Sequence, residues 1–577
     1  MTLKELRIIK GLSQEKCAKY LNVGLRTYQN YENDSNKINS LKYNIFMNKL
    51  KEYSSEIPLY LEEEISFKYY TNVVTGIGII ALSNQVTNYK KRDCYKLLEK
   101  YIYGNYIGKI CILYGLRRTG KTTLLFQMLG ELLNEKVAYI KIKTTDTMSN
   151  LTKDLNTLFK NGYKYIFIDE ITLLDDFINT SAVLSDIFSS MGMKIVVSGT
   201  DSLGFQMANR DELYDRNIMI HTSFIPFREY ENLLGIRDID KYIEYGGTLK
   251  MENMTLDDPD YMFDDVSFRD DESTRKYIDT SISRNIQHTL KNDNNGEYFN
   301  QLKDLYNNGE LTNVINRIVE NMNHNFLLNV IEEKFKSHDF GSAKNLLLHE
   351  IPNKTAYILD DVNKDKIIER LKRIIEIKEK EETNIVVTID HIEKIKKYLI
   401  MLDLIVNCPD VYESGKKEDH YIFTQPGMRY SIAKALVYSL LQDEYFNSNS
   451  ELDKKHIIDK ILEDVKGRML EEIVLLETTK SISKNKKAFK FKFDIGGEFD
   501  MVIYDTINNN CSIYEIKHSN KIIKNQARYL LDEEKCNIIK NKYGEITKKV
   551  IIYRGKTTKN DDNISYLNVE EYLISLK

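Results

Sequence analysis

A glycine-rich segment near the front of the chain has the residues of a loop that holds phosphate groups. The apolar run Lys109 to Tyr114 leads into Gly115-Leu116-Arg117-Arg118-Thr119-Gly120-Lys121-Thr122, a complete GxxxxGKT pattern, and a helical pattern follows it. Glycines let the backbone wrap around phosphates, and amide N–H groups at a helix start point at anionic oxygens. The pattern therefore predicts that ATP, or another nucleoside triphosphate, binds here.

The polar side chains of this loop have separate expected roles. Lys121 supplies a cation for the outer phosphates, so we count it among the catalytic residues. The Thr122 hydroxyl is positioned to ligate the Mg²⁺ ion that accompanies ATP. The expected nucleotide contacts in the loop are Gly115, Arg118, Thr119, Gly120, Lys121, Thr122 and Thr123.

A second segment supplies the acidic partners that ATP hydrolysis needs. The β-rich run Tyr163 to Phe167 and Ile168 ends in Asp169 and Glu170. We expect Asp169 to hold the magnesium shell and Glu170 to orient and polarise the water that attacks the γ-phosphate. Acid pairs after buried strands are also common helix caps, but the preceding phosphate loop favours hydrolysis of ATP.

A third apolar strand pattern, Met193 to Val197, ends in Ser198-Gly199-Thr200. A polar side chain at this end could sense the γ-phosphate. Serine and threonine also end strands simply because they form turns, so both interpretations stay open.

Length and composition limit the class of protein. A chain of 577 residues predicts about three or four domains. Its 29% charged and 42% hydrophobic residues are typical of a globular protein. The net charge of −4 provides no overall basic field for nucleic acid, so DNA contacts must come from local patches. The six cysteines lack CxxC spacing, which favours neither a zinc site nor a disulfide framework.

The chain shows no targeting or membrane signal. Met1 leads directly into a charged helical pattern, and no run of about 18 apolar residues occurs. We therefore expect a soluble, cytoplasmic protein without a membrane partner.

The first residues read as three short helices joined by tight turns, at Leu3 to Lys10, Ser13 to Leu21 and Leu25 to Glu32. Ser13 caps the second helix, and apolar residues recur where a small core needs them. The segment resembles the helix-turn-helix of the Cro and repressor family, through Leu12-Ser13-Gln14, Ala18, Thr27-Tyr28 and Tyr31-Glu32.

This resemblance implies that the third helix enters the DNA major groove. The implied DNA contacts are Gln14 near the backbone and Arg26, Thr27, Gln29 and Asn30 facing bases. A helical bundle used for protein contacts is the alternative. One such module per chain binds weakly, so specific binding requires a symmetric homo-oligomer.

A second cluster of chemically active residues is expected near the end of the chain. Beyond about Asp453 the pattern is a helix, three strands, a helix and another strand. Asp500 sits mid-strand, and Glu515 and Lys517 share one face of the next strand by their two-residue spacing. Asp500 and Glu515, with Glu471 as a third carboxylate, could hold Mg²⁺ or Mn²⁺. Lys517 could then stabilise the phosphorane of phosphodiester hydrolysis.

This constellation resembles the PD-(D/E)xK restriction-endonuclease-like family, whose core motif Asp500, Glu515 and Lys517 match and whose helix glutamate Glu471 matches. Phe499 stands where the family name has proline. The alternative is that Glu-x-Lys is an exposed charge pair on an edge strand. Activity is a separate question, because a metal site can decay while its fold persists.

Residues 85–577 as a whole resemble the bacterial and archaeal ATPases of the DUF4143 type, which join a P-loop domain and a winged helix to a nuclease-like domain. The segments that carry the likeness are Tyr114 to Thr122, Ile168-Asp169-Glu170, Pro226-Phe227-Arg228-Glu229-Tyr230, Gly467 to Glu471 and Glu498-Phe499-Asp500. The resemblance implies a STAND-like or AAA-like sheet with a strand inserted between the P-loop and acidic strands, and magnesium ATP as cofactor.

The same resemblance implies that Arg216 contacts a γ-phosphate, within one subunit or between subunits. Asp215 precedes Arg216 where the family commonly has glycine, so Arg210 is a competing candidate.

The expected fold class is multidomain, α and α/β. The expected ranges are a helix-turn-helix at 1–60, a linker at 61–84, a P-loop ATPase at 85–250, a helical region at 251–384, a winged helix at 385–450 and a nuclease-like domain at 451–577. Within the helical region we expect an acidic loop at 257–271 and a charged, solvated helix at 364–381.

The preferred functional hypothesis is a DNA-binding ATPase whose ATP hydrolysis controls a DNA-directed activity, with metal-dependent DNA cleavage by the C-terminal domain as a candidate. Phage defence or control of mobile elements would suit such a protein by analogy only. The alternative is an ATP-responsive transcriptional regulator with a non-catalytic nuclease-like fold. A third hypothesis, protein remodelling, predicts no salt-sensitive DNA retention.

Overall fold

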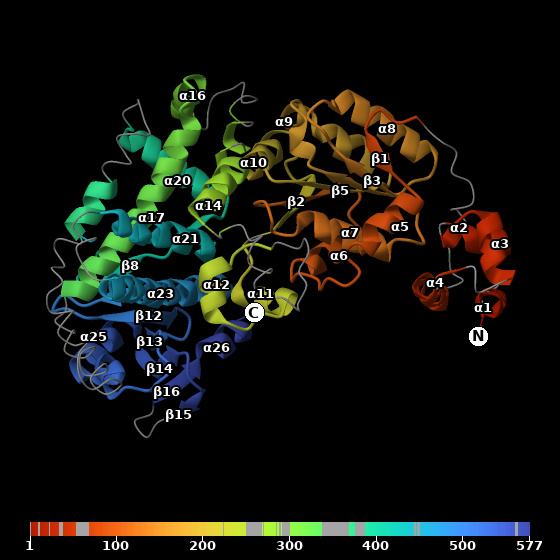
Figure 1. Cartoon of the computed structure of the whole chain (residues 1–577). Helices are drawn as coiled ribbons and strands as arrows, with labels where there is room; N and C mark the ends of the chain where they lie inside the picture. Colours follow the sequence, from red (N-terminus) through yellow and green to blue (C-terminus); the bar gives the residue numbers. More distant parts are fainter. Residues whose placement is uncertain are drawn as a thin grey trace.

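The computed structural model of the chain has three regions joined in sequence order (Figure 1). A small helical unit stands at the N-terminus, a six-stranded sheet with its helices follows, and a helical layer leads to an eight-stranded sheet. The residues described are 2–9, 12–21, 23–33, 38–52, 68–222, 224–249, 268, 270–283, 285–287, 290, 300–336, 368–375, 387–443, 446, 451–559 and 564–576. Most of the expected loop at 257–271 lies outside them, and 368–375 is helical within the expected helix at 364–381.

The N-terminal unit contains the three predicted helices and a fourth that was not predicted. They are α1 (Leu3–Ile9), α2 (Gln14–Tyr20), α3 (Leu25–Asn33) and α4 (Ser40–Glu52). The Ser13 side chain accepts a hydrogen bond from the Lys16 amide and so caps α2 as expected. Leu6, Ala18 and Tyr28 are buried together with Phe46 of α4, which closes the small core.

The central sheet has the strand order β1-β3-β4-β5-β2-β6. Its strands are β1 (Asn72–Val74), β2 (Ile110–Tyr114), β3 (Val137–Lys141), β4 (Tyr165–Asp169), β5 (Lys194–Gly199) and β6 (Asn217–His221). All neighbours pair in parallel except β1, which is antiparallel to β3. Strand β5 lies between β2 and β4, so the expected inserted strand is confirmed.

Helices cover both faces of this sheet (Figure 1). They are α5 (Ile77–Asn84), α6 (Tyr95–Tyr103), α7 (Lys121–Glu131), α8 (Met148–Lys160), α9 (Phe177–Thr180) and α10 (Ser202–Asp211). Alternate residues of β2 enter different cores: Cys111 and Leu113 pack with α6 and α7, and Ile110 and Ile112 pack in the core that contains α8. Burial on both faces explains why the strands read as continuous apolar runs.

A helical layer connects the two sheets. Its elements are α11 (Phe227–Leu234), α12 (Ile239–Tyr245), α14 (Asp271–Ile278), α16 (Asn300–Asn307), α17 (Leu311–Lys336), α20 (Ile389–Met401), β7 (Ile405–Asn407), β10 (Tyr421–Phe423) and α21 (Pro426–Ser439). Strands β7 and β10 form an antiparallel pair between α20 and α21. The winged helix expected at 385–450 stays a prediction. Helix α21 is buried along most of its length.

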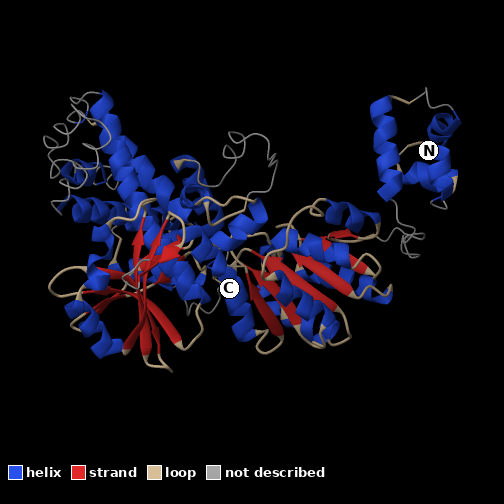
Figure 2. Cartoon of the chain, turned by 90° about the horizontal axis from the view of Figure 1, so that it is seen from below, coloured by secondary structure: helices blue, strands red, loops and turns tan. Residues whose placement is uncertain are grey.

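The C-terminal sheet has the order β15-β16-β14-β13-β12-β11-β8-β9 (Figure 2). Its strands are β8 (Asp410–Tyr412), β9 (Lys417–Glu418), β11 (Lys486–Lys492), β12 (Glu498–Asp505), β13 (Asn510–Lys517), β14 (Glu545–Tyr553), β15 (Thr558–Lys559) and β16 (Ile564–Asn568). Its helices are α23 (Glu451–Ser481), α24 (Arg528–Leu531), α25 (Glu533–Tyr543) and α26 (Val569–Ser575). Helices α23 and α25 contribute to different cores, on opposite faces of the sheet.

One part of this sheet was not expected from the sequence. Strands β8 and β9 come from the range assigned to the winged helix, yet β8 pairs in parallel with β11 of the C-terminal sheet. The two regions therefore share a continuous sheet edge.

Short turns of other helix types complete the described elements. They are 3₁₀ turns at Ile171–Leu173, Leu440–Gln442 and Lys524–Ala527, and π turns at Leu184–Ser189 and Asp279–Ser283. Among the described residues, no helix combines the length and the apolar composition needed to cross a bilayer.

Candidate functional site

The glycine-rich loop connects β2 to α7 and has the backbone conformation that the sequence predicts. Gly115, Arg118 and Gly120 have positive φ angles of 148°, 62° and 82°. A side chain at Gly115 would place its Cβ 2.5 Å from the Thr222 carbonyl oxygen, so this position requires glycine. The loop thus presents amides at the start of α7, where anions bind favourably.

Lys121 folds back over this loop. Its Nζ donates to the carbonyl oxygens of Gly115, at 2.8 Å, and Leu116, at 2.7 Å. Burial lowers the pKa of Lys121 to about 8, although Glu170 and Asp169 oppose that shift. A phosphate in the loop would offset the burial and hold the ammonium in its charged form.

Asp169 is the most heavily hydrogen-bonded carboxylate of the central sheet. It accepts from the hydroxyls of Thr122, at 3.1 Å, and Tyr139, at 2.9 Å, and from Ser198. Lys141 Nζ lies 2.8 Å from the same carboxylate. Burial would raise the pKa of Asp169, but Lys141 and these hydrogen bonds outweigh it and lower the pKa. Asp169 is therefore ionised beside the Thr122 hydroxyl, and this pair of oxygen donors fits a hard cation such as Mg²⁺.

Sequence reasoning missed Lys141. It ends β3 directly opposite Asp169 in the parallel register with β4. A signal was available, because residues that end neighbouring parallel strands meet at one edge of a sheet.

Glu170 and the end of β5 lie at the same edge. Glu170 has φ 58° and ψ 39°, an unusual conformation for glutamate that is often found at functional sites. The Ser198 hydroxyl donates to Asp169, whereas the Thr200 hydroxyl faces the Asn285 side chain at 3.3 Å. Of the two candidate γ-phosphate sensors, Ser198 is the one that contacts the acidic strand.

Arg216 lies at the opposite edge of the sheet. It precedes β6, whose Asn217 pairs with Ile110 at the start of β2, one strand length, or about 16 Å, from the loop after β2. Its guanidinium pairs with Asp186 at 3.0 Å, and both side chains are about half exposed. This position contradicts the expected γ-phosphate contact within one subunit, because the length of β2 separates Arg216 from the phosphate loop. A contact between subunits stays a prediction, as does the competing candidate Arg210, which is exposed in the last turn of α10.

A buried arginine that sequence reasoning missed ties the loop to α11. Arg92 Nη1 donates to the carbonyl oxygen of Thr119 at 2.8 Å, and Arg92 Nε lies 2.6 Å from Glu229. Both side chains of this ion pair are less than a tenth exposed. Glu229 belongs to the Pro226 to Tyr230 segment, so that segment holds Arg92 against the phosphate loop.

Helix α11 contacts the C-terminal region at the same time. The Phe227 amide of α11 donates to Glu477 Oε1 of α23 at 2.8 Å. The Tyr242 hydroxyl of the next helix, α12, donates to the same oxygen at 3.0 Å. Arg228 Nη1 donates to the Leu576 carbonyl oxygen, after α26, at 3.0 Å. Burial raises the pKa of Glu477 to about 7. One short helix thus contacts both the loop's arginine and α23.

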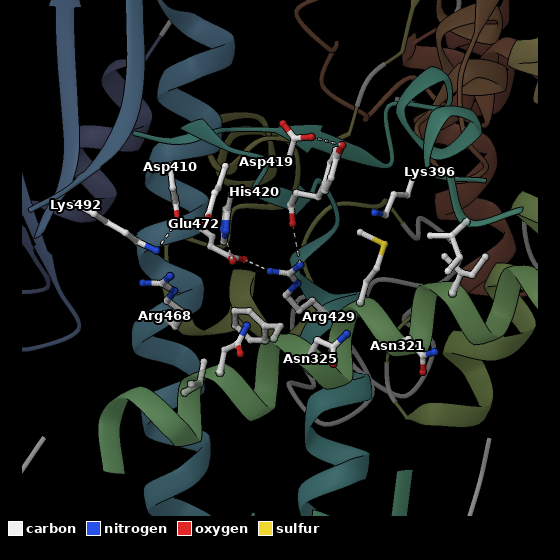
Figure 3. A pocket seen from close by; sticks show the side chains of 18 residues that line it. Asn321, Asn325, Lys396, Asp410, Asp419, His420, Arg429, Arg468, Glu472 and Lys492 are labelled. Atoms are coloured by element: carbon white, nitrogen blue, oxygen red, sulfur yellow. Dashed lines mark hydrogen bonds and ion pairs between the residues drawn. The ribbon is translucent and has the colours of Figure 1, made fainter. Parts of the chain in front are cut away.

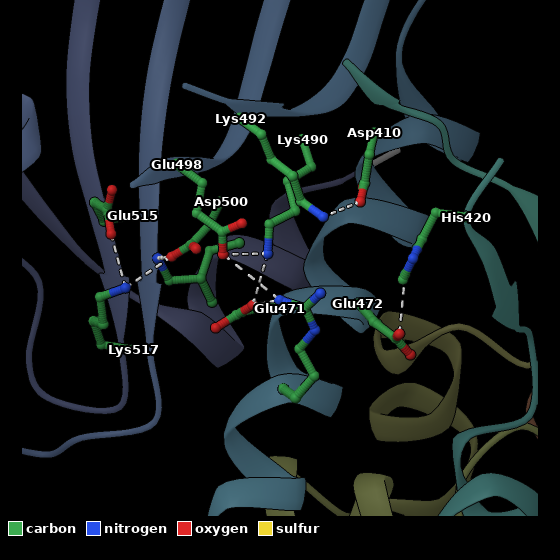
Figure 4. A network of polar contacts seen from close by, with 12 residues as sticks. Asp410, His420, Glu471, Glu472, Lys490, Lys492, Glu498, Asp500, Glu515 and Lys517 are labelled. Atoms are coloured by element: carbon green, nitrogen blue, oxygen red, sulfur yellow. Dashed lines mark hydrogen bonds and ion pairs between the residues drawn. The ribbon is translucent and has the colours of Figure 1, made fainter. Parts of the chain in front are cut away.

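The second candidate site brings together the residues predicted in the C-terminal domain (Figure 4). Lys517 Nζ lies 2.9 Å from Asp500 and 2.7 Å from Glu515. The Ile516 amide donates to Asp500 at 2.7 Å. Helix α23 packs on this face of the sheet and contributes Glu471, whose carboxylate lies within 4.8 Å of that of Asp500. Burial and the charge of Asp500 raise the pKa of Glu515.

The set of close carboxylates differs from the predicted metal ligands. Oxygens of Glu471, Glu498 and Asp500 all lie within 4.8 Å of one another, and Glu498 takes the place expected for Glu515. Glu498 and Asp500 share one face of β12 because they are two residues apart, so the sequence contained this signal. Three oxygen donors at this spacing fit a hard divalent cation.

Two cations that were not predicted also contact these carboxylates. Lys490 Nζ lies 2.6 Å from Glu498 and 3.3 Å from Glu471, and its side chain is only 5% exposed. Arg468 Nη1 lies 2.8 Å from Glu471. Lys517 is a third cation, which pairs with Asp500 and Glu515, so a metal ion would have to compete with existing ion pairs.

Comparison with known proteins agrees with the geometry of the first site. Residues 108–231 match the family model of an AAA domain. Strands β2 to β6 of the central sheet lie inside this match, which supports a P-loop ATPase domain of AAA type. The match covers the phosphate loop, the Asp169 strand and Glu229 of α11, but it leaves the rest of the chain unassigned.

One curated protein also resembles part of this chain. An uncharacterized protein of Methanocaldococcus jannaschii, MJ1544, is 26% identical over 198 residues, which are 32% of this chain and 44% of that protein. The chain thus spans less than half the length of this curated relative.

Solved structures give only weak likenesses. A katanin structure concerned with self-assembly has a TM-score of 0.19 at 16% identity and covers 34% of this chain and 71% of its own. The Hsp104–ADP complex of S. cerevisiae has a TM-score of 0.22 at 12% identity, with 68% and 50% covered. The Orc1 protein of Aeropyrum pernix in complex with DNA has a TM-score of 0.21 at 12% identity, with 68% and 96% covered. At these TM-scores the likenesses carry no argument about this chain.

The burial of the Arg92–Glu229 pair leads to a prediction about the free energy of unfolding. Arg92→Ala should lower the free energy of unfolding by about 3–5 kcal/mol, because Glu229 would remain buried without its partner. The matched control Arg216→Ala removes an exposed pair and should cost less than about 1 kcal/mol. Denaturant unfolding of both full-length variants measures the difference, and equal losses would contradict the role assigned to Arg92.

Glu477 makes a pH prediction. Its pKa is raised from 4.5 to about 7 in the folded protein, so its contribution to stability is complete below pH 4.5 and lost as the pH rises to about 7. Glu477→Gln removes this loss. Relative to the wild type, the variant should therefore gain about 3 kcal/mol between about pH 5 and about pH 8 in denaturant unfolding. The exposed control Glu534→Gln should show no such pH-dependent gain.

Proposed function

We propose that this chain is a DNA-binding ATPase in which the nucleotide state of the AAA domain controls a DNA-directed activity of the C-terminal region. The observation that carries the proposal is the path from Thr119 through Arg92 and Glu229 to α11, and from the Phe227 amide to Glu477 of α23. Glu471 of the carboxylate site lies on α23 six residues before Glu477, or about 9 Å along the helix.

The ATPase step uses the groups gathered at the edge of the central sheet. Thr122 and Asp169 would hold Mg²⁺, which supplies positive charge next to the β- and γ-phosphates. Lys121 neutralises charge that develops on the outer phosphates. Glu170, directly after Asp169, orients and polarises the attacking water.

A movement of the phosphate loop can reach α23 through Arg92, Glu229 and α11. Phosphate binding would pull Lys121 away from the Gly115 and Leu116 carbonyl oxygens, and so change the loop that Arg92 contacts at Thr119. Arg92 is buried and contacts both the Thr119 carbonyl oxygen and Glu229 of α11. We therefore expect a displacement of the loop at Thr119 to move α11.

The DNA-directed activity that best suits the carboxylate site is metal-dependent cleavage of a phosphodiester. The order α23, β11, β12, β13, α25, β14, with β14 parallel to β13, supports the expected nuclease-like fold. Glu471, Glu498 and Asp500 would hold the Mg²⁺ or Mn²⁺ ion. Lys517, fixed between Asp500 and Glu515, would stabilise the negative charge of the phosphorane.

A second function is favoured by one specific observation. Lys490 and Arg468 already neutralise the carboxylates, as they would in a site that has lost its metal. In that case the chain is an ATP-responsive transcriptional regulator, and the C-terminal fold serves as a scaffold.

Both functions use the N-terminal helices to hold DNA. Arg26, Thr27 and Asn30 are exposed on α3, where they can reach base edges. Gln29 Nε2 donates to Gln14 Oε1 at 3.3 Å, so the proposed contacts of these two side chains would come from a linked pair. Specific binding would use a homo-oligomer, which supplies two such units to a symmetric DNA site.

Two AAA-domain variants test the proposed ATPase roles. Lys121→Ala should abolish high-affinity MgATP binding in calorimetry, because the outer phosphates lose their cation. Glu170→Gln should leave binding intact and slow phosphate release by about a hundredfold or more. The exposed control Glu135→Gln should match the wild type in both measurements. Loss of binding in Glu170→Gln equal to that in Lys121→Ala would contradict the separate roles.

DNA cleavage distinguishes the two proposed functions. With MgATP and either Mg²⁺ or Mn²⁺, the full-length protein should nick plasmid DNA, and Asp500→Asn or Lys517→Ala should reduce nicking by about a hundredfold or more. Lys542→Ala, an exposed lysine on α25, serves as the control.

Nicking that survives both substitutions would exclude this carboxylate site as the nuclease. If no variant nicks DNA but all of them retard a promoter fragment in a salt-sensitive way, the regulator is the correct function.

A further inference from the structure

A pocket outside the AAA domain lies between the helical layer and the C-terminal sheet (Figure 3). Its volume is about 570 Å³, within the range of small-molecule sites. Helices α17, α20, α21 and α23 and strands β8 to β11 supply its walls. Neither the AAA match nor the proposed ATPase and cleavage steps use this pocket.

A buried charge network forms its floor. The Glu472 carboxylate lies 3.0 Å from His420 Nε2 and pairs with Arg429 Nη1. The Arg429 guanidinium lies over the rings of Phe326 and Phe423, at 4.4 and 5.0 Å from their centroids. Burial opposes the charge on Glu472, but Arg429 and His420 outweigh it and lower its pKa to about 2. The floor is therefore a charged network that packs against two aromatic rings.

One end of the pocket adjoins the carboxylate site. Arg468 and Lys492 both line this end, and Arg468 also pairs with Glu471 of the carboxylate site. Lys492 Nζ lies 2.6 Å from Asp410 Oδ2. The other oxygen, Asp410 Oδ1, is buried and has no hydrogen-bond partner among the described residues. This end thus holds two cations, each paired with a carboxylate, and, within the described part of the chain, one carboxylate oxygen without a partner.

The opposite wall combines amides with apolar surface. Asn321, Asn325 and Asn329 are four residues apart on α17, so they lie along one face of that helix. Asn321 is half-buried, and Asn325 and Asn329 are exposed. Met322 and Tyr421 add flat or flexible apolar surface beside them.

The charges that line the pocket restrict the ligand. Four side chains are cationic and four are acidic: Lys396, Arg429, Arg468 and Lys492 face Asp410, Glu418, Asp419 and Glu472. A balanced lining disfavours a polyphosphate, which would need a surplus of cations. It suits a ligand with one anionic group and a neutral body that has polar edges.

We propose that this pocket binds a single nucleotide unit, with its phosphate at Arg468 and Lys492 and its base along the asparagine face of α17. Carboxamides pair with base edges by donating and accepting together. The Tyr421 ring also borders the pocket, with Lys396 Nζ 5.5 Å from its centroid, and a base would pack beside this pair. The unit can be a free nucleoside monophosphate, or one nucleotide of a single strand whose adjacent phosphate lies at the carboxylate site. The proposal goes beyond the proposed function, because binding here requires neither ATP hydrolysis nor cleavage.

Binding to the full-length protein tests the pocket. The probes are the four deoxynucleoside monophosphates and a short fluorescent single-stranded oligonucleotide, titrated in a Lys121→Ala background so that the AAA site does not contribute. Replacing both Asn325 and Asn329 with alanine should weaken binding about tenfold or more, from the loss of two hydrogen bonds. Asn313→Ala, an exposed asparagine on α17 outside the pocket, is the matched control.

The two sources of the nucleotide give different results. Monophosphate binding that the double variant weakens indicates a free nucleotide, and oligonucleotide binding alone that the double variant weakens indicates a strand. The proposal is overturned if neither probe binds, or if Asn313→Ala weakens binding as much as the double variant.

A photo-crosslinking measurement keeps the test independent of the variants. An oligonucleotide that carries thiothymidine should crosslink to the peptide that contains residues 318–330 or to Tyr421, as mapped by mass spectrometry. Crosslinks found only elsewhere would also overturn the proposal.

The experiments distinguish failure of the pocket proposal from failure of the cleavage proposal. Unchanged probe binding in the double variant, together with loss of nicking in Asp500→Asn, would exclude the pocket alone. Weakened probe binding together with unchanged nicking in Asp500→Asn would exclude the cleavage site alone.

Discussion

The buried pair of Arg92 and Glu229 is the interaction on which the arrangement of this protein depends. A guanidinium this deeply buried must have all its charge compensated, and here the partners are the Thr119 carbonyl oxygen and the Glu229 carboxylate. The phosphate loop and α11 are therefore held at a fixed distance. Because the Phe227 amide of α11 binds Glu477, that constraint extends to α23 and the C-terminal sheet.

Helix α23 carries residues of the carboxylate site, of the neighbouring pocket and of the contact with α11. It is 31 residues long, and successive turns of one segment face different surroundings. Arg468 and Glu471 face the carboxylate site, Glu472 forms the floor of the neighbouring pocket, and Glu477 contacts α11. A rigid helix with three such contacts would carry the proposed link between the AAA domain and the carboxylate site without any change of fold.

The sequence predicted the local motifs well. The phosphate loop, the Asp169 strand and the first three helices depend on short-range patterns, so their elements appear where expected. The three-strand pattern with Asp500, Glu515 and Lys517 was equally readable. Glu498 was missed although its two-residue spacing from Asp500 was visible, because the resemblance implies Glu515 as the metal ligand. Arg92 had no local signal, since its partner Glu229 lies 137 residues away in the sequence. Lys490 was missed although its partner Glu498 is near in the sequence, on the adjacent strand β12.

The sequence by itself determined which residues could hold phosphate and which strands and helices would carry them, because glycine spacing and apolar periodicity act over a few residues. Only the tertiary structure decided which charges meet. Strand order placed Ser198 beside Asp169 and set Arg216 at the far edge of its sheet, and the packing of α23 brought Glu471 to Asp500 and Arg468 to the pocket. Ion pairs between distant segments follow from how layers pack, and no short sequence pattern encodes that.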